Sequence, residues 1–343
     1  MPSPDGRIDL RSDTVTSPTP EMRRAMAGAE VGDDVFGEDP TVNRFQEHAA
    51  ELLGKDAGLY VPSGTMANQV ALRVLGRPGT AFVCADRSHI YRVEGESTAT
   101  SGIEPVLLPD RDGLFGAGAL EEAFASRPRG AISLVTIENT HAAADGSPAR
   151  PEEVRAIGAT AGGHDVPVHC DGARIWNASI ALGVPVRDLV GSVTTAMFCV
   201  SKGLGAPVGS VLCGPTDVIA EAHAWRRRLG GAMRQAGVIA AAGLVALDTM
   251  IERLADDHRR ARELADELAQ RFPGCVDPEC VRTNIVWARL DRLPAGLLDR
   301  LRDEGVWALA LGDRARFVTH KDIDDDDLDR VVKTLREVSP ANA

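Results

Sequence analysis

Short apolar runs alternate with amphipathic stretches along the first two thirds of the chain. Because the apolar runs are nearly continuous, they predict strands of a sheet that is covered on both faces. Stretches with helical periodicity lie between several of them, for example at 66–75 and 152–162. This alternation predicts an α/β fold with a mostly parallel central sheet and right-handed crossovers. The predicted strands are 81–84, 105–108, 132–137, 167–170, 195–200 and 210–213.

The pattern changes in the last third of the chain. Residues 235–271 predict an almost unbroken helix, which a Pro-Gly pair ends. Shorter strands and helices then predict a small α+β unit. We therefore expect a large domain at 1–247, with a polar N-terminal segment at 1–30, and a small domain at 248–343. The elements expected in the small domain are strands at 284–290 and 316–319 and helices at 294–304 and 326–338.

Charge and composition exclude several classes of protein. The net charge of −12 argues against a nucleic-acid-binding surface, and the basic run at 225–228 is expected to be a solvated helix face. The apolar stretch near 238–250 is shorter than the roughly 20 residues of a membrane span, and the first residues lack the features of a signal peptide. The six cysteines fit a reducing compartment, and neither they nor the histidines follow a zinc spacing. We therefore expect a cytoplasmic protein without a metal site and without a nucleic-acid or membrane partner.

Only four lysines are present among 38 basic residues, so lysine chemistry has few candidates. Lys202 stands in a Ser-Lys-Gly segment directly after the predicted strand at 195–200, and open α/β sheets bind ligands at the carboxyl ends of their strands. Desolvation there would make the amine nucleophilic, as Schiff-base chemistry requires. An exposed loop lysine explains the same pattern equally well.

Other polar residues also follow predicted strands. Asp171 and Arg174 come after the strand at 167–170, where a carboxylate can pair with a cationic ring nitrogen of a cofactor. The alternative is an ordinary turn with a surface ion pair. His89 and His141 each follow a strand and are candidate acid–base or ring-stacking groups, although an isolated histidine is more often structural.

One polar turn opens a predicted helix. Ser63, Gly64 and Thr65 precede the helix at 66–75, and free N–H groups at a helix N-terminus bind phosphate. A plain N-cap gives the same sequence, so this signal is weak by itself.

Together these segments resemble the L-threonine aldolase family, which are pyridoxal-5′-phosphate (PLP) enzymes of fold type I, the aspartate-aminotransferase-like fold. The resemblance covers nearly the whole chain, and its most specific parts are Arg-Ser-Asp-Thr at 11–14 and Gly-Asp-Asp-Val at 32–35. The other matching segments are 63–66, 88–90, 138–141, 171–174, 201–204, 206–210, 229–231, 233–237 and 318–321.

The resemblance implies roles around the cofactor ring. Lys202 resembles the lysine that forms the internal aldimine with PLP, and Asp171 resembles the partner of the pyridinium nitrogen. His89 resembles the residue that stacks on the ring. Arg174 resembles a ligand of the cofactor phenolate or of the substrate carboxylate.

Further roles concern the phosphate, the substrate and a second subunit. Gly64 and Thr65 resemble the phosphate cradle, and Ser12 and Arg316 resemble the clamp on the substrate carboxylate. Arg234 resembles a residue that reaches a neighbouring subunit's cofactor, and the family resemblance implies a homotetramer built as a dimer of dimers.

The implied reaction is cleavage of L-threonine or L-allo-threonine to glycine and acetaldehyde, with His89, His141 or a water held by them as the base. Two loops depart from the family pattern, at 91–94 and 142–146, and both concern substrate range. The alternatives are β-elimination or another β-hydroxy amino acid lyase, such as a phenylserine aldolase, and a PLP-binding protein without turnover.

Overall fold

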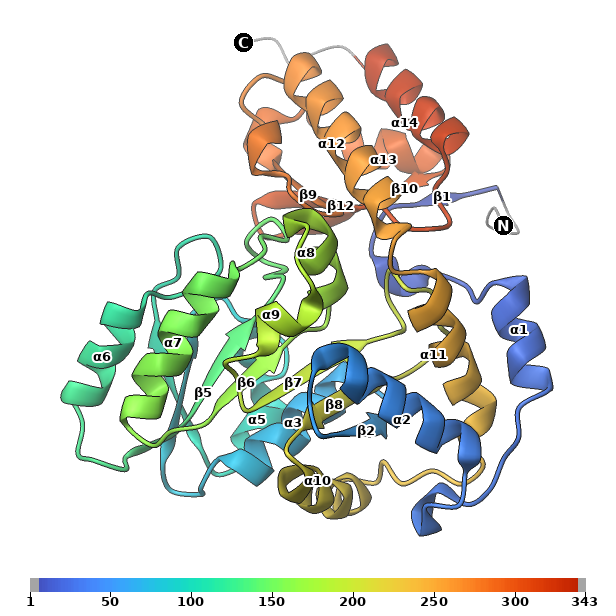
Figure 1. The fold of residues 1–343 in the computed structure, drawn as a ribbon. Coiled ribbons are helices and arrows are strands. Elements are labelled where there is room, and N and C mark those ends of the chain that lie inside the picture. Colours follow the sequence, from blue (N-terminus) through green and yellow to red (C-terminus); the bar gives the residue numbers. More distant parts are fainter. Residues whose placement is uncertain (1–5, 339–343) are drawn as a thin grey trace.

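A seven-stranded sheet in the order β2-β8-β7-β6-β5-β3-β4 runs through the larger part of the protein (Figure 1). β8 is antiparallel to both of its neighbours, and the other neighbouring strands are parallel. The carboxyl ends of the parallel strands therefore lie at one edge of the sheet. The computed structural model describes residues 6–338. The strands are β2 (Ala57–Val61), β3 (Ala81–Ala85), β4 (Glu104–Leu108), β5 (Ile132–Glu138), β6 (Val168–Asp171), β7 (Thr195–Cys199) and β8 (Ser210–Gly214).

Helices cover both faces of this sheet, which explains why its strands are apolar along their whole length (Figure 1). In β7, Phe198 points into the core of one face, whereas Met197 and Cys199 point into the core of the other. On the first face lie α2 (Pro40–Leu53), α6 (Ala117–Ala125), α7 (Pro151–Gly163), α8 (Ile175–Leu182), α9 (Val186–Val190) and α11 (Gly237–Thr249), with α1 (Pro20–Ala27) packed on α11. On the second face lie α3 (Gly64–Leu75), α4 (His89–Arg92), α5 (Gly95–Ala99) and α10 (Thr216–Arg228).

A smaller unit with its own apolar core lies beside the large sheet (Figure 1). Its antiparallel sheet has the order β11-β12-β9, and α12 packs against β9 and α14. Its elements are α12 (Leu254–Arg271), β9 (Ile285–Arg289), α13 (Leu297–Asp303), β10 (Val306–Trp307), β11 (Leu309–Leu311), β12 (Arg314–Val318) and α14 (Asp325–Glu337). Short 3₁₀ turns are η1 (Asp13–Val15), η2 (Asp34–Phe36), η3 (Pro278–Cys280) and η4 (Leu290–Arg292).

The N-terminal segment connects the two units. Its strand β1 (Ile8–Asp9) pairs in parallel with β10, and Ile8 and Leu10 are buried in the core of the smaller unit. Immediately afterwards the chain crosses to the large unit, where the Thr16 hydroxyl donates to the Lys202 carbonyl at 3.0 Å. Residues 8–16 therefore contribute to both units. The proposed division at 247/248 falls near the end of α11 and stays a prediction.

The predicted fold class is confirmed, and each of the six predicted strands of the large sheet is present. Two details differ. β2 was not predicted, because Gly58 interrupts its apolar pattern; a side chain there would lie 2.6 Å from the Gln46 carbonyl of α2. The helix expected at 235–271 is two helices separated by a turn at 250–253, where Arg253 binds Asp257 and the Gly203 carbonyl.

Within the described residues, no helix combines the length and apolar character needed to cross a membrane.

Candidate active site

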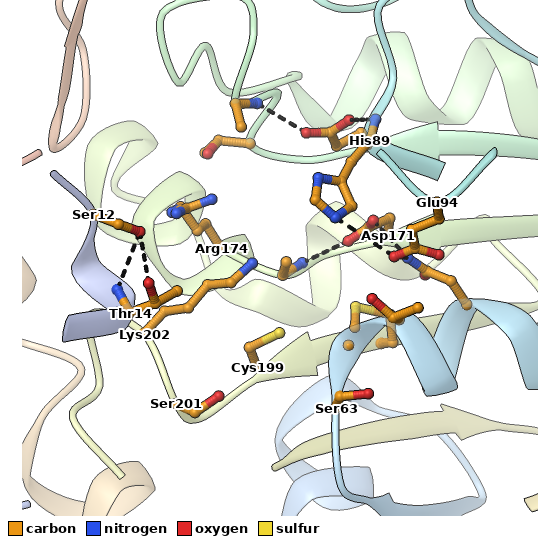
Figure 2. Close-up of a pocket in the computed structure, with 18 of the residues that line it drawn as sticks. Ser12, Thr14, Ser63, His89, Glu94, Asp171, Arg174, Cys199, Ser201 and Lys202 are labelled. Carbon is orange, nitrogen blue, oxygen red and sulfur yellow. Dashed lines mark hydrogen bonds and ion pairs between the residues drawn. The ribbon is translucent and has the colours of Figure 1, made fainter. Parts of the chain in front are cut away.

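A cavity of about 360 Å³ opens at the carboxyl ends of β5, β6 and β7 (Figure 2). The N-terminus of α3 forms one wall, and the N-terminal segment and β12 of the smaller unit close the other side. Parallel strands of an open α/β sheet present their ligand sites at this edge. The predicted site residues that line the cavity are Ser12, Gly64, Thr65, His89, Asp171, Arg174, Lys202 and Arg316.

Lys202 lies three residues beyond the end of β7 and points into the cavity (Figure 2). Its amine makes no hydrogen bond or ion pair with another residue in the described range 6–338. The other lysines differ. Lys55 donates to the Val193 carbonyl at 2.6 Å, Lys321 pairs with Asp322, and Lys333 is exposed on α14. Lys202 is therefore the lysine that the fold leaves available for a covalent bond.

Asp171 is buried at the end of β6 and remains an anion. It accepts hydrogen bonds from Asn68 Nδ2 at 2.8 Å and from the Ala173 backbone at 3.1 Å. Burial opposes its ionisation, but electrostatic interactions with His89 and Lys202 together with these hydrogen bonds hold the pKa of Asp171 below its usual value. The cavity thus contains a fixed negative charge that favours a cationic ligand group.

Glu94 is a second buried carboxylate in the same wall, but its electrostatics differ. It accepts from Asn68 at 3.1 Å and from Gln69 at 3.2 Å, and its oxygen lies 3.5 Å from His89 Nε2. Burial and the nearby charge of Asp171 raise the pKa of Glu94. Of the two carboxylates, Asp171 is therefore the one that holds the negative charge more firmly.

The start of α3 supplies an anion-binding end. Ser63 is the N-cap, and its hydroxyl accepts from the Met66 N–H at 3.2 Å. Gly64 has no room for a side chain, since a Cβ would lie 2.9 Å from Cys199 Sγ. This contact brings the first turn of the helix against the end of β7, and with it the backbone N–H groups that favour a phosphate.

Two arginines line the cavity, and they differ in how their guanidinium nitrogens are hydrogen-bonded. Arg174 is held by Asp13 through two hydrogen bonds of 2.6 and 2.7 Å, which occupy Nη2 and Nε. Arg316 donates from Nη2 to the Arg11 carbonyl at 3.0 Å, whereas its buried Nε has no hydrogen-bond partner within residues 6–338. An unsatisfied guanidinium nitrogen at a cavity wall is suited to an incoming carboxylate.

His89 and His141 do not take equivalent positions. His89 begins α4 and lines the cavity, with its backbone N–H donating to Glu138 at 2.7 Å. His141 is buried outside the cavity lining, against Gly113 and 3.6 Å from Glu138. Glu138 also accepts from the Ala142 N–H at 2.9 Å, so this carboxylate fixes the loops of both histidines.

Arg234 lies away from this cavity. Its side chain is largely exposed and pairs with Asp33 at 3.3 Å. The neighbouring Phe36 is 74% exposed, an unusual position for an aromatic side chain. Arg234 therefore has no contact with the site of its own subunit.

The sequence did not reveal Asn68, Glu94, Glu138 and Thr140, which also line the cavity. Glu138 could have been found, because it ends a predicted strand in the same way as Asp171. Asn68 lies within α3 and Glu94 in the turn between α4 and α5, where no pattern separates a buried polar residue that faces a ligand from one that serves packing.

Comparisons with known proteins agree with this geometry. The family described as beta-eliminating lyase matches residues 9–291. Low-specificity L-threonine aldolase 1 of Arabidopsis thaliana is 41% identical over 94% of this chain and 93% of its own length. Low specificity L-threonine aldolase of Escherichia coli (strain K12) is 36% identical over 96% and 98%. The solved threonine aldolase structure of Leishmania major is 19% identical, with a TM-score of 0.83 over 96% of this chain and 98% of that chain.

The fold and the cavity define a PLP-dependent lyase of fold type I. The donor set fits this cofactor, since one cavity combines an unpaired lysine, a buried carboxylate kept ionised and a helix N-terminus. Within that class, the chain belongs to the beta-eliminating lyase family, in the group of L-threonine aldolases.

Proposed function

We propose that this protein cleaves L-threonine, L-allo-threonine and related β-hydroxy-α-amino acids to glycine and an aldehyde, with PLP as cofactor. One observation carries the proposal. A single cavity combines an unpaired Lys202, an ionised Asp171 and a guanidinium of Arg316 with an unsatisfied nitrogen. The relatives that cover nearly the whole chain at 36–41% identity carry the name low-specificity L-threonine aldolase.

Different residues of the cavity would bind different groups of the cofactor. Lys202 would hold its aldehyde carbon, Asp171 its ring nitrogen, and the turn of Gly64 and Thr65 at the start of α3 its phosphate. His89 would lie against the ring. When bound there, PLP supplies the electron sink that stabilises the carbanion left after the Cα–Cβ bond breaks.

The substrate carboxylate would bind between the two units. Arg316 offers Nε and the remaining N–H groups of its fork, and Ser12 lines the same side of the cavity, next to the Arg11 carbonyl that Arg316 contacts. Arg174 has less to offer, because Asp13 already occupies two of its nitrogens. We therefore assign Arg316 the main part of the carboxylate clamp and Arg174 a supporting part.

The β-hydroxyl group must lose a proton as it becomes the carbonyl of the aldehyde. We place His89, or a water bound to it, as the acceptor, because His89 lines the cavity and is paired with Glu94. His141 would act indirectly, since it does not line the cavity but lies 3.6 Å from Glu138, which does.

An assay of both threonine diastereomers tests this function. The purified protein with PLP should release acetaldehyde and glycine in equal amounts, and Lys202→Ala should release neither. Release of 2-oxobutyrate and ammonia would establish β-elimination instead. Binding of PLP with no product from either diastereomer or from phenylserine would leave a binding protein without turnover.

The assembly and location follow from the same proposal. We infer a homotetramer, built as a dimer of dimers, in which Arg234 contributes to the neighbouring subunit's site. The exposed Phe36 and Arg234, close together and away from their own cavity, support such an interface. The cytoplasmic location stays a prediction from the sequence.

A further inference from the structure

A chain of buried hydrogen bonds leads from the interior of the large sheet to Asp171. It begins at Thr195 in β7, passes through His169 in β6 and Asn68 in α3, and ends on the Asp171 carboxylate. Thr195 and His169 are 0% exposed and Asn68 is 1% exposed. His169 and Asp171 are two residues apart on one strand, so both point toward α3.

The Asn68 amide can take only one orientation in this environment. Its Nδ2 faces two carboxyl groups, Asp171 at 2.8 Å and Glu94 at 3.1 Å, and the ionised Asp171 can only accept hydrogen bonds. Both amide hydrogens are therefore used. The opposite orientation would place the Asn68 carbonyl oxygen against two carboxylates, which is strongly unfavourable in a buried site.

This orientation determines the state of His169. Asn68 Oδ1 is then the acceptor at 3.0 Å from His169 Nε2, so the proton of the imidazole must be on Nε2. His169 Nδ1 consequently accepts from the Thr195 hydroxyl at 2.8 Å. Burial lowers the pKa of His169 to about 4, although the charge of Asp171 and a hydrogen bond with the Thr195 backbone act in the opposite direction. The ring is therefore neutral at pH 7.

We propose that Asn68 is a positioning residue for the cofactor site, held in direction by the Nε2–H tautomer of His169. Its amide orients the Asp171 carboxylate toward the ring nitrogen of the cofactor. The same Nδ2 also donates to Glu94 and so holds that side chain in place. The identity of the cofactor rests on the proposed function, but the state of His169 does not. The two can therefore be tested separately.

The first test concerns the protein alone. Long-range nitrogen–proton spectra of the enzyme with ¹⁵N-labelled histidine separate the two neutral tautomers, and the spectrum of His169→Gln identifies the signal of His169. We expect the Nε2–H tautomer at pH 7. The Nδ1–H tautomer would overturn the proposal, because Asn68 could not then be oriented as described.

The second test measures PLP affinity by absorbance titration. Asn68→Leu removes the bond to a charged carboxylate and should raise the Kd for PLP by about tenfold or more. Gln69→Leu is the matched control. Gln69 is the next residue of α3, is also a buried amide, and contacts Glu94 and Thr98 but not Asp171. Its Kd should stay within about threefold of the wild-type value.

A pair of variants at His169 keeps the proposal testable if Asn68→Leu fails to fold. His169→Gln retains an N–H donor toward Asn68, and His169→Leu does not. We expect His169→Gln to bind PLP nearly as well as the wild type and His169→Leu to bind about tenfold more weakly. Equal affinities of the pair, or equal affinities of Asn68→Leu and Gln69→Leu, would refute the positioning role. If the wild type itself does not bind PLP, the proposed function fails, while the tautomer measurement still stands.

Discussion

Replacement of Arg316 by alanine is the most direct test of how the substrate is held. Arg316 belongs to β12 of the smaller unit but reaches the cavity at the end of the large sheet. Arg316 is not one of the cofactor ligands proposed above, and none of those ligands depends on it. Arg316→Ala should therefore leave the Kd for PLP unchanged and reduce catalysis of threonine cleavage.

The size of the effect follows from the hydrogen bonds that Arg316 can form. Its Nε is buried and unpartnered among the described residues, and its fork can offer a second N–H to the same carboxylate. Charge-assisted hydrogen bonds contribute roughly 1.5–3 kcal/mol each, so two contribute about 3 kcal/mol or more. Since 1.4 kcal/mol corresponds to about tenfold, kcat/KM should fall by about 100-fold or more. Arg316→Lys should recover little, because an ammonium group cannot form the fork.

The strand also provides a control. Arg314 is two residues away, contacts the same Trp287 ring and pairs with Asp145 outside the cavity lining. Arg314→Ala removes an equal charge from the same strand and should lower kcat/KM by less than about tenfold. A near-normal kcat/KM of Arg316→Ala in steady-state assays, or equal losses in both variants, would show that the clamp lies elsewhere. Arg174 would then be the leading candidate.

Three further predictions concern the cofactor bond, acid stability and assembly. Borohydride treatment of the yellow holoenzyme followed by peptide mapping should find the cofactor on Lys202; mapping to one of the other three lysines would disprove the assignment. Burial opposes ionisation of Asp13, but the charge and hydrogen bonds of Arg174 lower its pKa to about 2. Its contribution to stability, about 2 kcal/mol, is therefore fully present above its ordinary pKa of 3.8 and is lost as the pH falls toward 2; urea unfolding across this window should show a loss that Asp13→Asn lacks. Phe36→Asp should weaken assembly in sedimentation experiments and reduce activity together with it, whereas a fully active monomer would contradict a shared site.

The sequence predicted the parts of the site that follow strands. Lys202 and Asp171 were found because continuous apolar runs mark buried strands, and the residues after parallel strands meet at one edge. The same reasoning gives the wrong position for the His141 side chain. His141 also follows a strand, but its side chain packs against Gly113 outside the cavity lining, and the direction of a side chain in a loop has no periodicity to predict it.

The polar partners inside the fold could not be predicted for a different reason. Asn68 lies on the buried face of α3, where periodicity marks burial but does not say which strand the face meets. Its partners, Asp171 and His169, are about a hundred residues away in the sequence. Such pairs depend on the assembled topology, and the same is true of the contact between Arg253, at the break between α11 and α12, and the Gly203 carbonyl.

The pairing of β1 with β10 has a consequence for how the enzyme becomes active during synthesis. Ile8 pairs with Val306, so this segment waits for a partner that is synthesised roughly 300 residues later. At about 5–20 residues per second, that interval is on the order of 15–60 seconds. Ser12 and Asp13 follow β1 directly and complete the cavity wall and the support of Arg174. A nascent chain therefore remains catalytically incomplete until β10 has left the ribosome, however early the large sheet folds.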